Sequence, residues 1–326
     1  MLFNTVKIGI LSLPRPNGKP LHETARISRE IEELGHDPVP INYRRTAIGI
    51  TETGRQLYQY NPAGTEMWPI EIDAVIPRIG RFTKEGVLAL SALELASITS
   101  TATSNAVRIA KDKIETQMIL DKAGIPTPRS IIPVGKLPEK SDIFLKAIQS
   151  NHRGPVIIKS AAGSHGKGVT IAESRRSGRS IIDSLPEGPF MVQEFIEPSE
   201  NQRHDDIRLV VIGGQVITAM RRMAENNAEE EEFRANLSLG GKAEIYEPTQ
   251  REREMAIKSA EAVGLEIAGV DIMHSFRGPM VTEVNDNLEL GIENISGINI
   301  ASLMAKIAVD KAITSRSIFE NIDSDE

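Results

Sequence analysis

Apolar and polar residues follow two different periods in the first third of the chain. Apolar runs that predict strands are separated by stretches with the three-to-four-residue spacing of a helix. Two of these helices end at Gly35 and Gly124, and Pro126 follows the second, as helix termination requires. The predicted strands are VKIGILSL, DPVPIN and DAVIPRIG, and the predicted helices are 21–34, 84–96 and 107–123. This order predicts an α/β domain over residues 1–105.

From residue 106 onward, strands and short turns dominate the pattern, which predicts α+β structure. A glycine-rich loop and a short helix separate the first two strands, and Gly213-Gly214 predicts a tight hairpin turn between the next two. The predicted elements are the strands GPVIIKS, PFMVQEFI, DIRLVVI and QVITAMRR, and helices at 179–184 and 251–264. We expect two further domains here, a central one over 106–196 and a C-terminal one over 197–326.

The segment AGVDIMHSFRGPMVTEVN (268–285) predicts a β-hairpin that turns at residues 276–278. With a three-residue turn, Asp271 lies opposite Glu283, and Asn285 returns to the face of Glu283 because side chains alternate along a strand. Two facing carboxylates repel each other, so a cation is expected between them. Oxygen ligands favour Mg²⁺ or Mn²⁺ over Zn²⁺, and Mg²⁺ in enzymes commonly also holds phosphates. The alternative, solvated acids on an exposed hairpin, fits the apolar strand halves poorly.

A glycine-rich loop, KSAAGSHGKGV, follows an apolar strand. Gly163, Gly166 and Gly168 allow backbone N–H groups to approach an anion closely, while Lys159 and Lys167 add positive charge. The loop joins strand to strand, so it is neither a Walker A loop nor a dinucleotide-binding fingerprint. Phosphate binding and a plain hairpin turn both stay open on this pattern alone.

Composition narrows the class of protein. The chain has 326 residues, of which 40% are hydrophobic, which is enough for cores in two or three domains. It contains no cysteine, so disulfides, thiolate catalysis and cysteine zinc sites are excluded. A net charge of −7 argues against general nucleic-acid binding. Neither a cleavable signal nor an apolar run of the roughly 20 residues that a membrane span needs is present. We therefore expect a cytoplasmic protein that does not bind membranes.

Several motifs occur together in one order. They are DAVIPRIG, AKDK ending at Lys113, QEFI, DIRLVVIG, FRANLSLGG, AGVDI and EVN. With them the chain resembles the ATP-grasp superfamily, and within it the RimK-type glutamate ligases, over most of residues 6–305. The resemblance implies a three-domain ATP-grasp fold of α/β and α+β units, with an N-terminal pre-ATP-grasp domain. We also expect a homo-oligomer.

The resemblance carries roles over to individual residues. Arg208, Arg222 and Arg234 would be catalytic because they neutralise charge on the transferred phosphoryl group. Two Mg²⁺ or Mn²⁺ ions would be held by Asp271, Glu283 and Asn285. The residues implied in ATP binding are Lys113, Lys159, Gly163, His165, Gly166, Gly168, Glu194, Phe195, Ile196, Asp206, Arg234 and Asn236. In the alternative interpretation, the lysines only reach solvent from strand ends, QEFI is a core strand, and the arginines form surface ion pairs.

Two arginines follow the last strand of the first domain. Arg78 and Arg81 lie where α/β domains collect ligands, and we expect them to clamp a substrate carboxylate. Stabilisation of a domain interface by Arg78 is an equally open interpretation. The segment NDNLELGIE departs from the resembled family, because the usual proline turn after Asn285 is missing. This departure near the expected acceptor pocket puts an acidic amino-acid substrate in question.

Together these features predict an ATP-dependent carboxylate–amine ligase that works through an acyl-phosphate. The leading reaction is the addition of L-glutamate to a protein or peptide tail, such as that of a small-subunit ribosomal protein, as the resemblance implies. An alternative within the class is a ligase that adds an amino acid to a small molecule or a carrier protein. An alternative from another class is a nucleotide-binding regulatory protein that has lost catalysis, which the altered NDNLELG segment supports.

Overall fold

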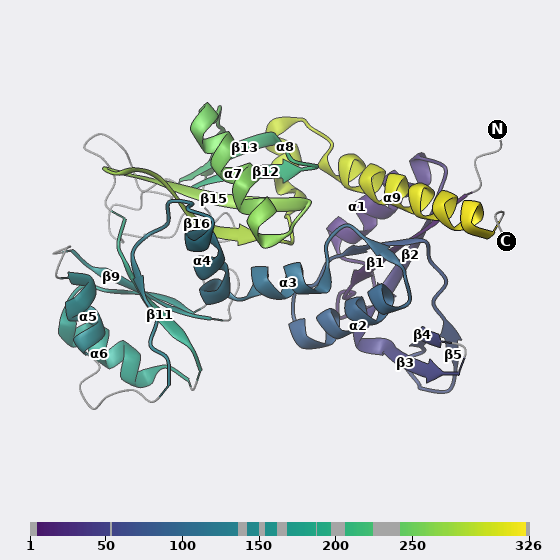
Figure 1. Ribbon diagram of the computed structural model, residues 1–326, viewed down its shortest axis with the longest axis horizontal. Helices are drawn as coiled ribbons and strands as arrows, with labels where there is room; N and C mark the ends of the chain where they lie inside the picture. The colour runs from purple at the N-terminus through teal and green to yellow at the C-terminus, as the bar shows by residue number, and fades with distance from the viewer. Residues whose placement is uncertain are drawn as a thin grey trace.

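The structure is a computed structural model that describes residues 5–52, 54–135, 142–149, 154–161, 168–186, 188–196, 206–223 and 242–323. These residues form four sheets with helices packed around them (Figure 1). No helix within these ranges is long and apolar enough to cross a membrane.

The N-terminal sheet is parallel, with strand order β2-β1-β6-β7. Its strands are β1 (Lys7–Ser12), β2 (Asp37–Asn42), β6 (Ala74–Pro77) and β7 (Thr99–Ser100), and its helices are α1 (His22–Glu33) and α2 (Thr83–Leu95). After the 3-10 helix η1 (Tyr43–Arg45), a small antiparallel sheet consists of β3 (Thr46–Thr51), β4 (Gly54–Tyr60) and β5 (Met67–Pro69). Because parallel strands end at the same edge of a sheet, the residues that follow β1 and β6 meet there. Arg78 lies at this edge.

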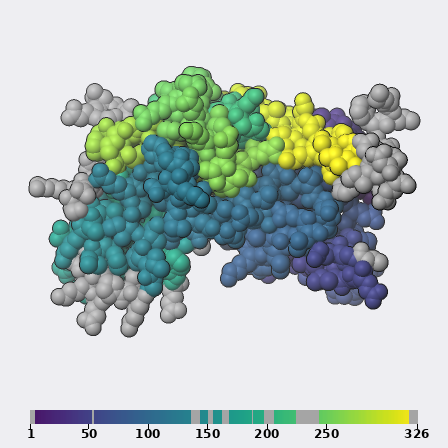
Figure 2. All heavy atoms as spheres, viewed as in Figure 1, coloured from purple at the N-terminus to yellow at the C-terminus, as the bar shows by residue number. Residues whose placement is uncertain are grey.

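The last helix, α9 (Ile300–Asp323), returns to the N-terminal sheet. A stripe of small residues, including Ala301, Ala305 and Ala308, lets α9 pack closely in one core with residues of α1, β1 and β6. Arg316 fixes this contact with a bidentate ion pair to Asp73, at 2.7 Å for both Nε–Oδ1 and Nη2–Oδ2. Figure 2 shows α9 in yellow as a continuous bridge between the C-terminal sheet and the N-terminal part. The first and last parts of the chain therefore share a core.

The central sheet is antiparallel and has the order β10-β9-β11-β8. Its strands are β8 (Ser130–Ile131), β9 (Val156–Ser160), β10 (Val169–Ala172) and β11 (Phe190–Glu194), and α5 (Asp142–Gln149) and α6 (Arg175–Ser184) pack on it. Helix α6 begins earlier than predicted because Ser174 caps it in a capping box with Ser177. Strands β9 and β10 pair Lys159 with Val169, so the glycine-rich loop joins two antiparallel strands, as predicted.

The C-terminal sheet is also antiparallel, with the order β14-β13-β12-β15-β16. Its strands are β12 (Asp206–Ile212), β13 (Gln215–Met223), β14 (Lys242–Ile245), β15 (Ile267–Ser275) and β16 (Gly278–Asn285). Nearby helices are α3 (Ser104–Lys111), α4 (Lys113–Lys122), α7 (Gln250–Val263), η3 (Leu290–Ile292) and α8 (Glu293–Ser296). The predicted turn at Gly213-Gly214 is confirmed, and the positive φ angles of 58° and 73° explain why both residues are glycine.

The β15–β16 hairpin differs from its predicted form in two ways that cancel. Ser275 pairs with Gly278, so the turn has two residues and the predicted three-residue turn is wrong. The register then shifts at a bulge beside Thr282, which is left out of the ladder. The bulge restores the predicted pairing of Asp271 with Glu283. The two carboxylates therefore face each other through a different local geometry.

Candidate active site

One face of the C-terminal sheet is apolar, and the opposite face is charged at one end and apolar at the other, where Val210 and Ile212 pack in the core shared with α9. Ile207, Leu209 and Val270 point into a core with α3, α4 and α7. Because side chains alternate along a strand, their neighbours Asp206 and Asp271 point to the opposite face. The alternating pattern of DIRLVVI and AGVDI thus builds both a core and a charged surface.

Asp271 is the centre of the charged face. Arg208 binds it in a bidentate arrangement, with Nε–Oδ1 and Nη2–Oδ2 distances of 2.7 Å. Arg222 Nη2 lies 3.0 Å from Oδ2, and Asn285 Nδ2 donates to the same oxygen at 3.3 Å. Burial opposes ionisation, but the two guanidinium groups lower the pKa of Asp271 to about 2. The carboxylate is therefore charged at neutral pH.

Asp206 lies two residues before Arg208 on β12 and forms an ion pair with Arg222. Its Oδ1 is buried and has no hydrogen-bond partner among the described residues. Burial and the nearby charge of Asp271 raise the pKa of Asp206 to about 7. Two neighbouring carboxyl groups thus have pKa values far apart, which is common at functional sites.

Two lysines approach the hairpin from other elements. Lys113 begins α4, where Asp112 caps the helix, and its Nζ lies 2.5 Å from Glu283 Oε1. Its backbone N–H donates to Ala161 O at the end of β9, which links α4 to the central sheet. Burial lowers the pKa of Lys159, on β9, to about 8, although Glu283 acts in the opposite direction.

A small cavity brings these groups together between the central and C-terminal sheets. It is lined by Lys113 of α4, Lys159 of β9 and Glu283 of β16, and by apolar side chains such as Met191 and Leu120. The sequence spacing gave no direct indication that these three charged residues line one cavity. The arrangement offers two cations and a carboxylate beside an apolar wall. These charges suit phosphate groups, but the enclosed space of about 10 Å³ has room for one water molecule and not for a base.

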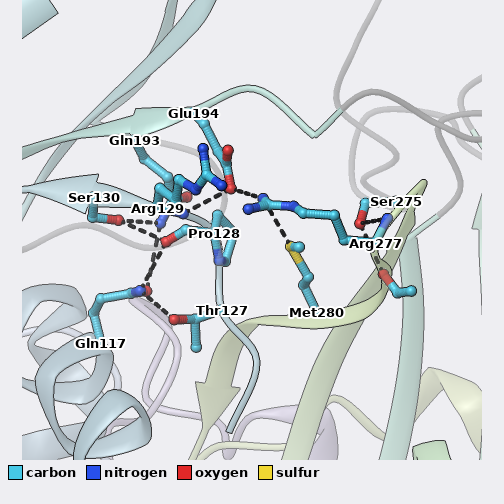
Figure 3. A network of polar contacts seen from close by, with 11 residues as sticks. Gln117, Thr127, Pro128, Arg129, Ser130, Gln193, Glu194, Ser275, Arg277 and Met280 are labelled. Carbon is cyan, nitrogen blue, oxygen red and sulfur yellow. Dashed lines mark hydrogen bonds and ion pairs between the residues drawn. The ribbon is translucent and has the colours of Figure 1, made fainter. Parts of the chain in front are cut away.

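Strand β11, which ends at the predicted ATP-binding residue Glu194, carries a polar network that sequence reasoning missed (Figure 3). The Glu194 carboxylate accepts from the Arg129 backbone N–H at 2.8 Å and forms an ion pair with Arg277, which reaches across from the turn of the β15–β16 hairpin. Gln193 Nε2 donates to Ser130 Oγ at 3.0 Å. Arg277 and Glu194 are 83 residues apart, so no local pattern could have paired them. Phe195 and Ile196 follow directly after this strand.

The two arginines predicted to clamp a carboxylate have different surroundings. Arg78 is 7% exposed, and its Nη1 has no hydrogen-bond partner among the described residues. Burial lowers the pKa of Arg78, while nearby acidic side chains raise it. Arg81 is exposed, and its backbone carbonyl accepts from the Tyr43 hydroxyl. The structure therefore does not bring the two guanidinium groups into one buried clamp.

The remaining predicted residues are divided between described and undescribed parts of the chain. Gly168 has a φ of 80°, and its carbonyl accepts from Ser160 N at 2.9 Å where the glycine-rich loop rejoins the sheet. The predicted residues that lie outside the described ranges are Gly163, His165, Gly166, Arg234 and Asn236.

The residues predicted to hold a metal ion fit one chemically. Within the described ranges no three His, Cys, Asp or Glu side chains form a metal cluster, so the candidate set is two carboxylates and the amide of Asn285. Lys113 lowers the pKa of Glu283 despite its burial, so both carboxylates are charged. Charged oxygen donors on adjacent strands match the preference of Mg²⁺.

Proteins of known structure share this fold. The RimK domain ATP-grasp protein from Sphaerobacter thermophilus aligns with a TM-score of 0.67 at 18% identity, covering 93% of this chain and 99% of that one. The ATP-grasp ligase PsnB, in complex with a minimal precursor, Mg and ADP, aligns with a TM-score of 0.66 at 20% identity, covering 94% and 98%. The chain thus has an ATP-grasp fold with a separate N-terminal unit.

Sequence comparison narrows the class further. A model described as a RimK-like ATP-grasp domain matches residues 110–308, and one described as a RimK PreATP-grasp domain matches residues 6–107. A relative from Hahella chejuensis named "Probable alpha-L-glutamate ligase 2" is 35% identical over 300 residues, which are 91% of this chain and 93% of that protein. The protein is an ATP-dependent carboxylate–amine ligase. It belongs to the RimK-like ATP-grasp family.

Proposed function

We propose that this ligase adds L-glutamate to the carboxyl terminus of a protein or peptide, with a ribosomal protein tail as the first candidate acceptor. The name of the Hahella relative and the precursor bound to PsnB support an amino acid and a peptide as the two substrates. The observation that carries the proposal is the cavity lined by Lys113, Lys159 and Glu283, next to the charged face around Asp271. A nucleoside triphosphate with its metal ion matches this combination of charges.

In this proposal, ATP lies between the central and C-terminal sheets. Lys113 and Lys159 bind phosphate oxygens, and the glycine-rich loop that ends at Gly168 covers them. The backbone of Glu194 and Phe195 binds the adenine edge. The ion pair between Arg277 and Glu194 supports this assignment, because it fixes the end of β11 against the C-terminal hairpin.

Asp271, Glu283 and Asn285 are the residues that would hold Mg²⁺, or Mn²⁺ in its place. Their support is the oxygen donor set on adjacent strands and the low pKa values of both carboxyl groups. When bound, the ion supplies positive charge that stabilises the phosphoryl oxygens during transfer.

Ligation needs no nucleophile from the protein. A substrate carboxylate oxygen attacks the γ-phosphorus of ATP and ADP leaves; the amine then attacks the acyl carbon, phosphate leaves, and the nitrogen loses a proton. Arg222 Nε is buried without a partner among the described residues, so it can donate to a phosphoryl oxygen. The remaining contribution of the protein is to hold both substrates in line and to exclude water from the acyl-phosphate.

The test uses the full-length chain with ATP, Mg²⁺ and a panel of amino acids, with and without a peptide copy of a ribosomal protein tail. We expect ADP release to require L-glutamate and the peptide, and the peptide to gain the mass of one or more glutamyl residues. Release with another amino acid as the added group would overturn the assignment to glutamate.

A second candidate is ligation of an amino acid to a small molecule or a carrier protein. The acidic residue Asp286, buried beside the candidate metal site, favours it because a carboxylate there repels an acidic substrate side chain. This candidate predicts ADP release without any peptide tail. Nucleotide binding without ADP release under every condition would instead favour the regulatory alternative.

A further inference from the structure

Three buried polar atoms at the junction of the N-terminal and C-terminal sheets have no hydrogen-bond partner among the described residues. They are Nη1 of Arg78, Oδ2 of Asp286 and Oδ1 of Asn287. Arg78 and Asp286 are only 7% and 9% exposed. Because buried polar groups in native proteins are nearly always satisfied, three such atoms in one region require an explanation.

The three atoms belong to one region because two elements meet there. Arg78 directly follows β6, and the segment that begins at Asp286 directly follows β16. Ile76 lies two residues before Arg78, and Leu288 lies two residues after Asp286. Both belong to the same hydrophobic core. Leu288 also lies against β15 so closely that a Cβ atom on Gly269 would come within 2.8 Å of it. The charges of Arg78 and Asp286 influence each other, since each changes the pKa of the other.

A purely structural role explains Arg78 poorly. The same part of the molecule contains a guanidinium that does have such a role, because Arg316 binds Asp73 with two contacts of 2.7 Å. Arg78 has acidic side chains nearby, yet it forms no ion pair with any of them among the described residues. Lys111 Nζ holds Asp286 by Oδ1 at 2.7 Å, which fixes the carboxylate and leaves Oδ2 open.

The unpaired atoms define the chemistry of their partner. Arg78 offers a cationic donor, which suits a carboxylate, while Asp286 and Asn287 offer two acceptors, one of them charged, which suits an ammonium group. A single small molecule that carries both groups is a free α-amino acid. A peptide terminus carries the carboxylate but replaces the ammonium group by one amide N–H.

We propose that Arg78, Asp286 and Asn287 form the subsite for the main-chain groups of the free amino-acid substrate, with Arg78 binding its α-carboxylate and the other two its α-amino group. This inference rests on the proposed function, since it assigns the amine substrate of that reaction. Lys111 is a positioning residue that orients Asp286. Other parts of the protein would contact the side chain of the amino acid. The subsite itself therefore selects a zwitterion and not glutamate in particular.

The test measures binding to the full-length protein in the presence of ADP and Mg²⁺, without turnover. The twenty proteinogenic L-amino acids are screened by thermal shift, and the strongest ligand is compared with its N-acetyl and α-amide forms by calorimetry. We expect both blocked forms to bind about tenfold more weakly or worse, because each leaves one buried charge unpaired. The proposal is overturned if the N-acetyl form binds as tightly as the free amino acid. It is also overturned if none of the twenty amino acids binds.

Variants separate the two ends of the subsite. Asp286→Asn is expected to lower the affinity for the amino acid about tenfold and to abolish discrimination against the N-acetyl form. The affinity for ADP should stay within about twofold of the wild-type value. Asn287→Ala should act in the same direction if Asp286→Asn fails to fold. Arg78→Met, which removes the cation, should abolish discrimination against the α-amide. Asp73→Asn is the control, because it removes a carboxylate from the same interface and should lower the melting temperature without changing amino-acid affinity.

The outcomes distinguish this proposal from the proposed function. If amino-acid ligation is observed but Asp286→Asn keeps normal affinity and discrimination, the subsite is wrong and the function stands. If the predicted discrimination is found but no peptide gains glutamyl mass, the subsite stands and the acceptor assignment fails.

Discussion

On the charged face of the C-terminal sheet, the carboxylates of the candidate metal site already have cationic partners: Arg208 and Arg222 bind Asp271, and Lys113 binds Glu283. At the edge of the N-terminal sheet, Arg78 forms no ion pair among the described residues, and Asp286 is paired only through Oδ1, with Lys111. Compensated charges keep a set of ligands ionised and in place before any substrate arrives. Uncompensated buried charges destabilise the free protein and are compensated only when a complementary molecule binds. The first arrangement suits catalysis, and the second suits recognition.

The largest effect should come from the compensated region. We expect Asp271→Asn and Glu283→Gln each to lower ligation about 100-fold or more, because charge stabilisation of the phosphoryl group is lost. Only Asp271→Asn should also unfold more easily, by about 3 kcal/mol, because it leaves two buried guanidinium groups poorly compensated. Turnover assays and urea unfolding measure the two effects. Normal turnover of either folded variant at saturating Mg²⁺ would rule out a metal-binding role for the residue that was replaced.

Replacing arginine by methionine in each region should give opposite stability changes. Arg208→Met breaks a buried ion pair and is expected to cost about 3 kcal/mol. Arg78→Met removes a buried cation without a partner, so the free energy of unfolding should stay the same or rise. Urea unfolding at equal protein concentration compares the two. Equal losses in both variants would show that Arg78 is a structural residue.

The pH dependence of kcat/KM for ATP should reveal the ionisation of Lys159. Its pKa of about 8 in the free protein is below the usual value for lysine, so its charge is present below pH 8 and lost above it. We expect kcat/KM for ATP, which reports the free enzyme, to fall by up to tenfold per pH unit above pH 8. Lys159→Arg should move this fall to higher pH. A wild-type profile that stays flat to pH 10 would contradict the phosphate contact.

The smallest effect concerns the contact between the two sheets at Glu194. Arg277→Gln removes the ion pair, although Glu194 keeps its hydrogen bond from Arg129. We expect KM for ATP to rise about fivefold, which corresponds to roughly 1 kcal/mol, with no change in KM for the amino acid. The exposed Arg129→Gln variant is the control, since it keeps the backbone donor. A parallel rise in both KM values would point to general distortion instead.

Alternation of apolar and charged residues predicted much of this architecture. The strands around Asp206 and Asp271 could be placed because each needs one apolar face for its core. The pairing of Asp271 with Glu283 was predicted from an incorrect turn, and a bulge at Thr282 compensated for the error. A bulge depends on the fit of neighbouring strands, so a count of residues along one hairpin cannot detect it.

Features that depend on distant contacts could not be predicted. The isolation of Arg78 arises only because the segment after β16 folds against the N-terminal sheet. The ion pair of Arg277 with Glu194 needs two sheets to meet. The metal roles of Asp271, Glu283 and Asn285, the phosphate role of the glycine-rich loop and the roles of Arg234 and Asn236 stay predictions.

The return of α9 to the N-terminal sheet has a consequence for biosynthesis. Arg316 and Asp73 are separated by 243 residues, and the core beneath them combines β1 and β6 with α9. While the chain emerges from the ribosome, the apolar side of this early sheet is covered only in part, by α1, until nearly the whole protein has been translated. The nascent chain thus exposes apolar surface for most of its synthesis. Such exposed surface promotes aggregation, which chaperones prevent.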